Sequence, residues 1–298
     1  MEDKQNPLVS VRVITYNSGK TVIETLESIK AQTYQNIELI ISDDCSSDNT
    51  IEICKKWLEQ NSKRFTRTKM LTVNKNTGVS ANILRAEKAC RGEWIKGIAG
   101  DDILKTDCIH TYIDYIRKHP SAIYIFSRCE TFGGKEDNRK RVDAQFRYDF
   151  FSLSLQQQYE RLVFEGNCIP AATNFYNRKM VEKLGVRYDA RIPLLDDWPR
   201  WINLIKSGVH FDFIDKELVR YRVSDNALST NMDNISPAYR KSLTLMYIYY
   251  QFPEEYKISS NKRETIYKYL RTRMSIADNK IVWHIICKCY KVLILHRW

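Results

Sequence analysis

Three pairs of adjacent aspartates are the residues of this sequence best suited to chemistry: Asp43-Asp44, Asp101-Asp102 and Asp196-Asp197. Adjacent carboxylates repel one another, and a simple turn could use Asn or Ser instead, so each pair needs a reason. A divalent cation supplies one, because Mg²⁺ and Mn²⁺ prefer oxygen ligands and take one or two carboxylates together with substrate phosphates. The alternative for Asp101-Asp102 is a solvated Gly-Asp-Asp turn, which needs no ligand.

The elements around the first two pairs alternate between strand and helix. β-Branched and aromatic runs predict the strands, and apolar residues three and four apart predict the helices between them. The predicted strands are 9–16, 37–41, 69–73 and 93–99, and the predicted helices are 21–32, 50–58 and 80–89. This order predicts an α/β fold with a mostly parallel central sheet flanked by helices.

Polar residues follow three of these strands, at Thr15-Tyr16-Asn17, Asp43-Asp44 and Asp101-Asp102. Because ligands of such sheets bind at the carboxyl ends of the strands, we expect these residues to meet at one edge. Asp44 could accept a hydrogen bond from a nucleotide base, and Tyr16 could stack on it, a contact worth about 1–3 kcal/mol in nucleic-acid complexes. The alternative for Tyr16 is an ordinary half-buried strand aromatic.

The third pair begins the segment Asp196-Asp197-Trp198, with Trp201 one turn later on a predicted helix, 196–207. Tryptophan faces beside carboxylates suit a sugar, so this arrangement predicts a general base between aromatic walls. The alternative is helix capping, because Asp near a helix N-terminus is favoured by caps and by the dipole alone.

The rest of the chain is less regular. We predict helices at 107–119 and 155–165, strands at 122–128, 171–176, 211–214 and 217–221, and a mobile loop at 132–146. From Pro237 the pattern is helical to the end. We therefore expect a catalytic domain over 1–230 and a basic, amphipathic helical extension over 231–298.

The net charge of +11 raises nucleic acid, an anionic membrane or a phosphate-bearing substrate as partners. The predicted strands carry no basic and aromatic stripe, so we expect no nucleic acid. The scattered cysteines lack zinc-site spacing, and the polar N-terminus has no apolar core of a signal peptide. No uncharged apolar run reaches the ~18 residues of a spanning helix. These features predict a cytoplasmic protein with reduced thiols that is not integral to a membrane.

The excess charge is concentrated in 261–298, which holds nine Lys and Arg against two acids. Within 278–298, Lys280, His284, Lys288 and Lys291 recur on one side of a predicted helix, with apolar residues on the other. This pattern predicts peripheral binding to an anionic membrane at the inner face of the plasma membrane. The alternative is an amphipathic helix that packs on its own catalytic domain.

Four stretches, 7–50, 74–104, 194–201 and 221–229, resemble glycosyltransferase family two of the bacterial polysaccharide type, which has the GT-A fold. The resemblance implies that the enzyme transfers a sugar, with inversion, to a glycan or lipid-linked acceptor. The expected donor is a nucleotide-sugar of the UDP-sugar type. It assigns the donor's base to Tyr16 and Asp44, the ribose or metal shell to Asp101, the Mn²⁺ or Mg²⁺ ion to Asp102, and the catalytic base to Asp197. Further donor contacts are expected from Thr15, Asn17 and Asn82, and acceptor contacts from Asp196, Trp198 and Trp201.

The sequence departs from the family pattern at two positions. Ala99 stands where the metal-binding element usually has its first aspartate, and Ser224 stands where a histidine often occurs. Two other functions compete with this interpretation. One is a module that binds a nucleotide-sugar without catalysis, although such a module needs no base. The other is a nucleotidyltransferase, although no glycine-rich phosphate loop precedes Gly78.

Overall fold

The computed structural model describes residues 6–189, 191–192, 194–224, 236–276 and 280–290. These residues form an eight-stranded mixed sheet with the strand order β3-β2-β1-β4-β7-β6-β8-β5. The strands are β1 (Val9–Thr15), β2 (Ile37–Asp43), β3 (Arg67–Leu71), β4 (Trp94–Ala99), β5 (Ile103–Leu104), β6 (Tyr124–Phe132), β7 (Phe175–Asn177) and β8 (Phe211–Arg222). β1, β2, β3 and β4 pair in parallel, β6 pairs in parallel with β8, and β7 joins the two groups by antiparallel pairs.

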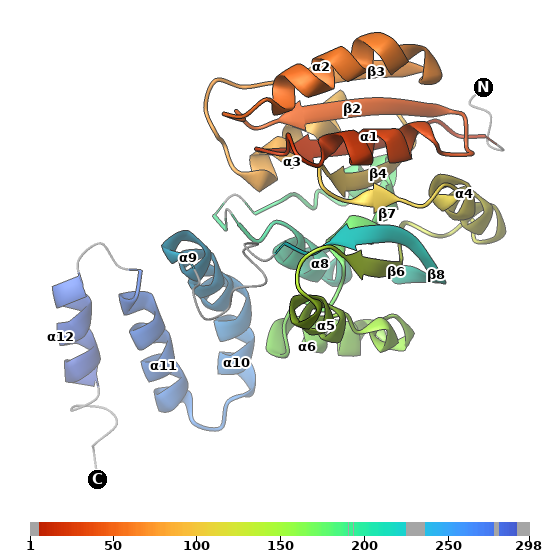
Figure 1. Cartoon of the computed structure of the whole chain (residues 1–298). Coiled ribbons are helices and arrows are strands. Elements are labelled where there is room, and N and C mark those ends of the chain that lie inside the picture. The colour runs from red at the N-terminus through yellow and green to blue at the C-terminus, as the bar shows by residue number, and fades with distance from the viewer. Residues whose placement is uncertain (1–5, 190, 193, 225–235, 277–279, 291–298) are drawn as a thin grey trace.

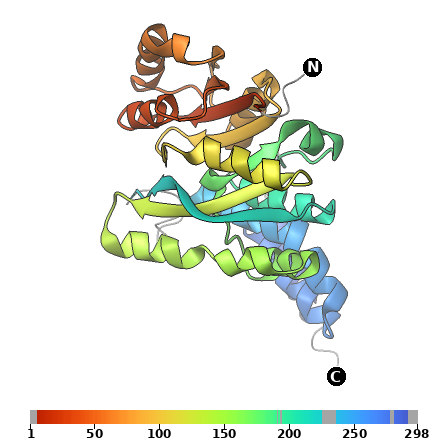
Figure 2. The same ribbon diagram turned by 90° about the vertical axis from the view of Figure 1, so that its right-hand side faces the viewer.

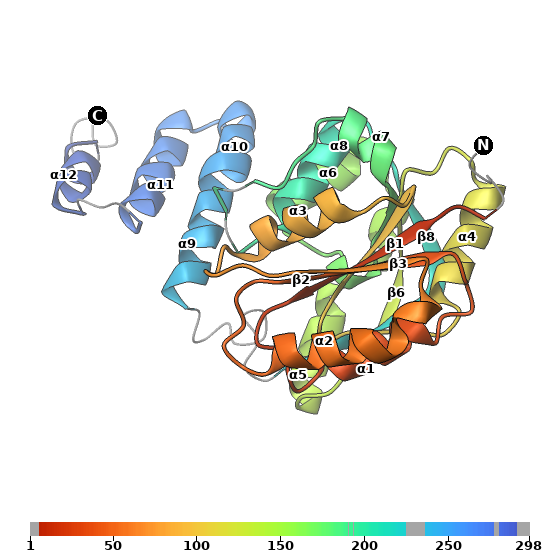
Figure 3. The same ribbon diagram turned by 90° about the horizontal axis from the view of Figure 1, so that it is seen from above.

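Helices cover both faces of the sheet (Figure 3). One face holds α1 (Val22–Lys30), α2 (Thr50–Asn61) and α4 (Cys108–Lys118), and the other holds α3 (Val79–Ala89), α6 (Leu155–Phe164) and α8 (Asp197–Lys206). Two apolar cores result, one on each face. The alternation of β1 explains the division, because Val9, Val11 and Val13 point to the first core while Arg12 points to the second.

The predicted edge is present. β1, β2 and β4 run in parallel with Thr15 opposite Asp43 and Ile14 opposite Ala99. The chain keeps this register beyond the strands, because Asp44 N–H bonds to Thr15 C=O at 3.0 Å and Gly100 N–H to Ile14 C=O at 2.9 Å. The polar residues after the three strands therefore meet at one edge of the sheet, on the side where the C-terminal helices begin (Figure 1).

Three predictions about the chain after residue 130 are wrong in whole or in part. The expected mobile loop at 132–146 contains α5 (Glu136–Gln145), which Figure 2 shows in yellow-green below β6 and β8. Only Val142 of this helix is buried, so the sequence of α5 shows almost no helical repeat of apolar residues. The predicted strand 171–176 is correct only at its end, because residues 171–173 form a 3₁₀ turn while Phe175 and Tyr176 belong to β7. The two predicted strands 211–214 and 217–221 are one strand, β8, whose polar middle is accommodated by a register shift against β6.

Two short elements were not predicted, β5 and α7 (Arg178–Lys183). Each is too short for a periodic pattern to appear.

The described part of the C-terminal segment is mostly helical, as predicted. α9 (Pro237–Met246), a π-helical turn (Tyr247–Gln251) and α10 (Phe252–Ile258) form one interrupted rod, followed by α11 (Lys262–Met274) and α12 (Lys280–Tyr290). Leu245, Met246 and Tyr250 of the rod belong to the same core as α8, whereas α11 and α12 extend away from the sheet (Figure 1). The predicted domain boundary at 230 lies outside the described residues. None of the described helices has the length and apolar character needed to span a bilayer.

Candidate active site

Asp44, at the end of β2, organises the start of α3. Its carboxylate accepts hydrogen bonds from Thr77 N–H at 3.0 Å, Gly78 N–H at 2.7 Å and Arg85 Nη2 at 2.9 Å. Burial opposes ionisation, but the bonds from Thr77, Arg85 and Gly78 prevail and hold the pKa of Asp44 below its usual range. Asp44 is thus an ionised acceptor fixed at the edge of the sheet, next to the residues that end β1.

The residues that end β1 have different roles. Thr15 is buried and bonds through Oγ1 to Asp43 at 2.7 Å, and Asn82 of α3 donates to Thr15 C=O at 3.3 Å. Asn17 has a positive φ of 50° and its Oδ1 accepts the N–H of Ser47 at 2.9 Å. Tyr16 between them is 52% exposed. The buried pair Thr15 and Asn82 shapes the edge, and the ring of Tyr16 is the part offered to a ligand.

Asp101 and Asp102 follow β4 beside the last residue of β8. Asp102 is 3% exposed, and its Oδ1 accepts the N–H of Arg222 at 2.8 Å. The Arg222 guanidinium bonds to the backbone C=O of Asp101 at 2.8 Å and to Glu24 at 2.9 Å. Burial, and then the charge of Asp101, raises the pKa of Asp102 well above its usual value, and burial raises that of Asp101. The pair therefore lacks a sufficient counter-charge within the protein.

A divalent cation fits this pair. Two carboxylates with raised pKa values are oxygen donors whose ionised form a cation would stabilise. No cluster of three or more His, Cys, Asp or Glu side chains suitable for a metal occurs in the described part of the chain. An ion held by Asp102 and Asp101 would therefore depend on substrate phosphates for the rest of its coordination shell, which is usual for Mg²⁺.

Asp197 begins α8 and is held by two donors. Asn167 Nδ2 bonds to its Oδ2 at 2.7 Å, and Trp198 N–H bonds to its Oδ1 at 2.7 Å. Burial raises the pKa of Asp197. Burial, together with the charge of Asp197, raises the pKa of the half-buried Asp196 to about 7. A carboxylate that is oriented and has a raised pKa is suited to accept a proton near neutral pH.

The two tryptophans of this segment differ from the prediction that both line a sugar site. Trp198 is half-buried, with its indole N–H bonded to Leu162 C=O at 2.7 Å. Trp201 is only 2% exposed and makes edge contacts with Tyr124 and Phe126. The expectation for Trp201 is therefore wrong, because its indole packs between core aromatic rings where a sugar cannot reach it.

Two further residues complete the site: Asn167, which has no sequence signal, and Tyr221, which belongs to the stretch 221–229 that resembles the family. Asn167 orients Asp197, yet it lies in a stretch without recognisable motif. Tyr221 on β8 feels the charges of Asp102, Asp101 and Asp197, which together with burial raise the pKa of its hydroxyl. Charges from the second and the third acidic pair, almost a hundred residues apart in sequence, therefore act on the same hydroxyl.

Comparison with known proteins agrees with this geometry. Residues 10–185, more than half of the chain, match the model of the family described as glycosyl transferase family 2. The chain belongs to this family. A Streptococcus pneumoniae glycosyltransferase, GlyG, is 35% identical over 118 residues, which span 40% of this chain and 38% of GlyG. The putative teichuronic acid biosynthesis glycosyltransferase TuaG of Bacillus subtilis is 24% identical over 76% of this chain and 82% of TuaG.

Solved structures show the same fold. The 1–349 fragment of S. aureus TarS in complex with UDP-GlcNAc superposes with a TM-score of 0.63 at 17% identity, covering 91% of this chain and 73% of that one. The mannosyltransferase PcManGT from Pyrobaculum calidifontis, in complex with GDP-Man and Mn²⁺, superposes with a TM-score of 0.58 at 13% identity, covering 98% and 81%. The expected GT-A fold is confirmed.

In this family 2 chain, a buried ion cluster connects the segment with Asp197 to the edge of the sheet formed by the ends of β1, β2 and β4, which we call the donor edge. Glu87 of α3 lies 3.0 Å from Nη1 of Arg200 on α8 and 3.7 Å from Nη1 of Arg12 on β1. Tyr188 O–H bonds to the same Glu87 oxygen at 3.2 Å, and so does Tyr176 O–H. The Arg200 guanidinium also stacks over the Tyr188 ring at 4.0 Å.

The cluster contains more positive than negative charge. Two guanidiniums that are almost fully buried face a single carboxylate, and Nε of Arg12 and Nε of Arg200 form no hydrogen bond within the described residues. The charges of both arginines act on Asp196, one turn before Arg200, and oppose the rise of its pKa. Asp196 therefore partly balances the charge of the cluster, so the same arginines affect both the stability of the fold and the electrostatics of the site.

The cluster of Glu87, Arg12 and Arg200 leads to a prediction about the stability of the fold. Glu87→Gln leaves two buried arginines without their carboxylate, and we expect the free energy of unfolding to fall by about 3–5 kcal/mol at pH 7 in urea titrations. Burial alone would raise the pKa of Glu87, but the charges of Arg200 and Arg12 prevail and lower it. The stabilisation is therefore lost as pH falls, and the difference from the unmodified chain should narrow below pH 4.5.

The matched control is Glu182→Gln, which removes an exposed ion pair with Arg178 and should cost at most about 1 kcal/mol. Equal, small effects of the two substitutions would show that the cluster does not hold α3 against α8.

Proposed function

We propose that this glycosyltransferase moves a sugar from a UDP-sugar to a hydroxyl group of its acceptor with inversion at the anomeric carbon. The observation that carries the proposal is the carboxylate of Asp197, oriented by Asn167 and by the Trp198 N–H, in the same fold as the poorly solvated pair Asp101-Asp102 at the end of β4. The TarS complex with UDP-GlcNAc supports a UDP-sugar on this fold.

The donor would lie across the ends of β1, β2 and β4. The exposed ring of Tyr16 stacks on the base, and Asp44, kept ionised by its own hydrogen bonds, accepts from the base edge. Asn17 and Asp101 line the same edge, supported from below by Thr15 and Asn82. The diphosphate then points toward Asp102.

Asp102, with Asp101, would hold the Mn²⁺ or Mg²⁺ ion. When bound, such an ion supplies positive charge to the departing diphosphate. The protein's own part is to keep the two carboxylates adjacent and poorly solvated, which Arg222 achieves by bonding to Oδ1 of Asp102 and to the backbone of Asp101. The Mn²⁺ complex of PcManGT supports metal use on this fold.

Asp197 is the proposed base. As the acceptor oxygen forms its bond to the anomeric carbon, the hydroxyl proton passes to the Asp197 carboxylate, and the bond to the diphosphate breaks with its electron pair. Asn167 and the Trp198 N–H hold the carboxylate in place during this step. Trp198 and Asp196 stand beside it on the acceptor side. A module that only binds nucleotide-sugars would have no use for this base.

A paired substitution tests these roles. Asp197→Asn keeps the shape of the side chain and removes its basicity, so we expect UDP release with acceptor present to fall about 100-fold while UDP affinity is unchanged. Asp102→Ala should weaken UDP binding in the presence of Mn²⁺ by about ten-fold or more. The reason is that the diphosphate oxygens coordinate the ion, so loss of a carboxylate ligand weakens the binding of both. Calorimetry gives the affinities and a UDP-release assay gives the rates.

The control for this pair is Asp114→Asn on the outer surface of α4, which should change neither quantity. Full activity of Asp197→Asn would contradict the role of Asp197 as base. UDP binding that resists a chelator and is unchanged in Asp102→Ala would contradict the role of Asp102 in metal binding.

We propose, in addition, that α12 attaches the enzyme peripherally to the inner face of the plasma membrane. Its apolar residues Ile281, Val282, Ile285 and Ile286 are 75%, 47%, 55% and 39% exposed, and Cys287 is buried near Arg271 of α11. The alternative, a helix packed on the catalytic domain, would bury these residues. Basic residues of α11 and the tail supply the attraction to anionic lipid, worth about 1 kcal/mol for each residue near the surface.

Vesicle co-sedimentation tests this attachment. We expect the full chain to bind vesicles with phosphatidylserine at low salt, and Ile281→Asp with Ile285→Asp to abolish binding, because charges at these positions cannot enter the interface. Tyr256→Asp, an exposed apolar position on α10, is the control and should retain binding. If the full chain ignores such vesicles, the attachment is wrong.

A further inference from the structure

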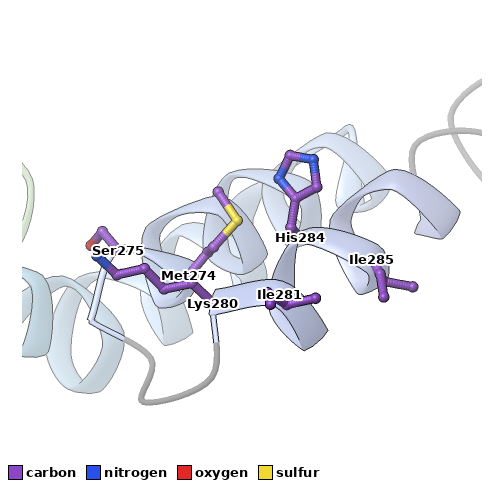
Figure 4. A pocket seen from close by; sticks show the side chains of 6 residues that line it. All are labelled: Met274, Ser275, Lys280, Ile281, His284 and Ile285. Atoms are coloured by element: carbon purple, nitrogen blue, oxygen red, sulfur yellow. The ribbon is translucent and has the colours of Figure 1, made fainter.

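The donor edge differs from the hollow on the C-terminal helices in how open it is. The hollow between α11 and α12 measures about 520 Å³ and is lined by Met274, Ile281 and Ile285 among others (Figure 4). Its lining includes no residue from the ends of β1, β2 and β4. At the donor edge, by contrast, Asp44 is only 3% exposed. A base can therefore reach the Asp44 carboxylate only if a group of the protein moves.

Four donors of the protein fill the acceptor positions of the Asp44 carboxylate. Its Oδ2 accepts the backbone N–H groups of Thr77 at 3.0 Å and Gly78 at 2.7 Å. Its Oδ1 accepts the hydroxyl of Thr77 at 2.5 Å and Nη2 of Arg85 at 2.9 Å. An ionised carboxylate offers about four such positions and donates nothing. An N–H of a base can therefore bond to Asp44 only by displacing one of these four donors.

Three of the four donors cannot leave by themselves. Two are backbone N–H groups at the start of α3, where Gly78 has a φ of 86°. The third, Arg85, also donates from Nε to Ser42 Oγ at 3.0 Å and from Nη2 to Asn82 Oδ1 at 2.9 Å. Ser42 and Asn82 are buried, so these two bonds fix the guanidinium against the sheet.

The hydroxyl of Thr77 is the donor that can leave. Thr77 is exposed, and rotation about one side-chain bond moves its hydroxyl while the backbone stays in place. The hydroxyl oxygen also accepts a hydrogen bond from Nη1 of Arg85 at 3.2 Å, so its own proton is directed at Asp44. The hydroxyl thus occupies the one acceptor position of Asp44 that a base can take.

We infer that Thr77 is a specificity-determining residue of the donor site, because its hydroxyl competes with the base for the Asp44 carboxylate. One vacated position accepts one N–H. Uracil supplies this N–H at N3, whereas N3 of cytosine is itself an acceptor. The inference rests on the proposed function, which places the base at Tyr16 and Asp44, and it adds the residue that limits the affinity for that base.

Calorimetry with UDP and with CDP, both in the presence of Mn²⁺, tests this competition on the full chain. Thr77→Val keeps the branched shape and removes the hydroxyl, so UDP should bind about three- to ten-fold tighter while the affinity for CDP stays the same. Thr77→Ser keeps a hydroxyl and should match the unmodified chain for both nucleotides. Thr72→Val, at another exposed threonine just after β3, is the matched control and should change neither affinity.

The outcomes separate this inference from the proposed function. Unchanged or weaker UDP binding in Thr77→Val would overturn the inference alone, because the hydroxyl would then not compete with the base. An equal gain for CDP would also overturn it, since the gain would not depend on an N–H at N3. A chain that binds neither UDP nor CDP in the presence of Mn²⁺ would refute the proposed donor, and the inference with it.

Discussion

The contact between Glu87 and the buried arginines is the interaction on which the rest of the site depends. Glu87 reaches Arg12 on the sheet and Arg200 on α8, so one carboxylate holds three elements together. α3, which carries Glu87, also carries Asn82 and Arg85, whose bonds reach Thr15 and Asp44 at the donor edge. α8 begins with Asp197. The distance between the donor edge and the proposed base is thus set by a charge cluster from which water is largely excluded.

Seven of the described carboxylates form two groups that differ in the direction of their pKa shift. Glu38, Asp44 and Glu87 have pKa values below the usual range, because hydrogen bonds or arginine charges outweigh their burial. They stay ionised and hold the fold. Burial raises the pKa values of Asp101, Asp102, Asp196 and Asp197, and the neighbouring aspartate adds to the rise for Asp102 and Asp196. These four require a cation, a proton or a substrate, and such groups are typical of functional sites.

Much of the donor edge was predictable, because its sheet is built from strands that pair close in sequence and carry strong periodic patterns. The prediction that Tyr16, Asp44 and Asp101-Asp102 meet at one edge needed only parallel pairing. The Arg12, Glu87 and Arg200 cluster was not predictable, because a charged residue in a strand or helix gives no local sign of its partner. α5 was missed because a nearly fully exposed helix has no apolar period. The exposure of the apolar face of α12 is likewise a tertiary property, which a sequence pattern leaves open.

The central claim is that Asp197 acts on the opposite side of the anomeric carbon from the diphosphate. The most direct test is the proton NMR spectrum of the glycoside formed in the first turnovers from an α-linked UDP-sugar. A single displacement with Asp197 as base predicts a β-linked product, recognised by the coupling constant of its anomeric proton. An α-linked product would contradict the account, because retention requires a different attacking group or direction from the one that this carboxylate can serve.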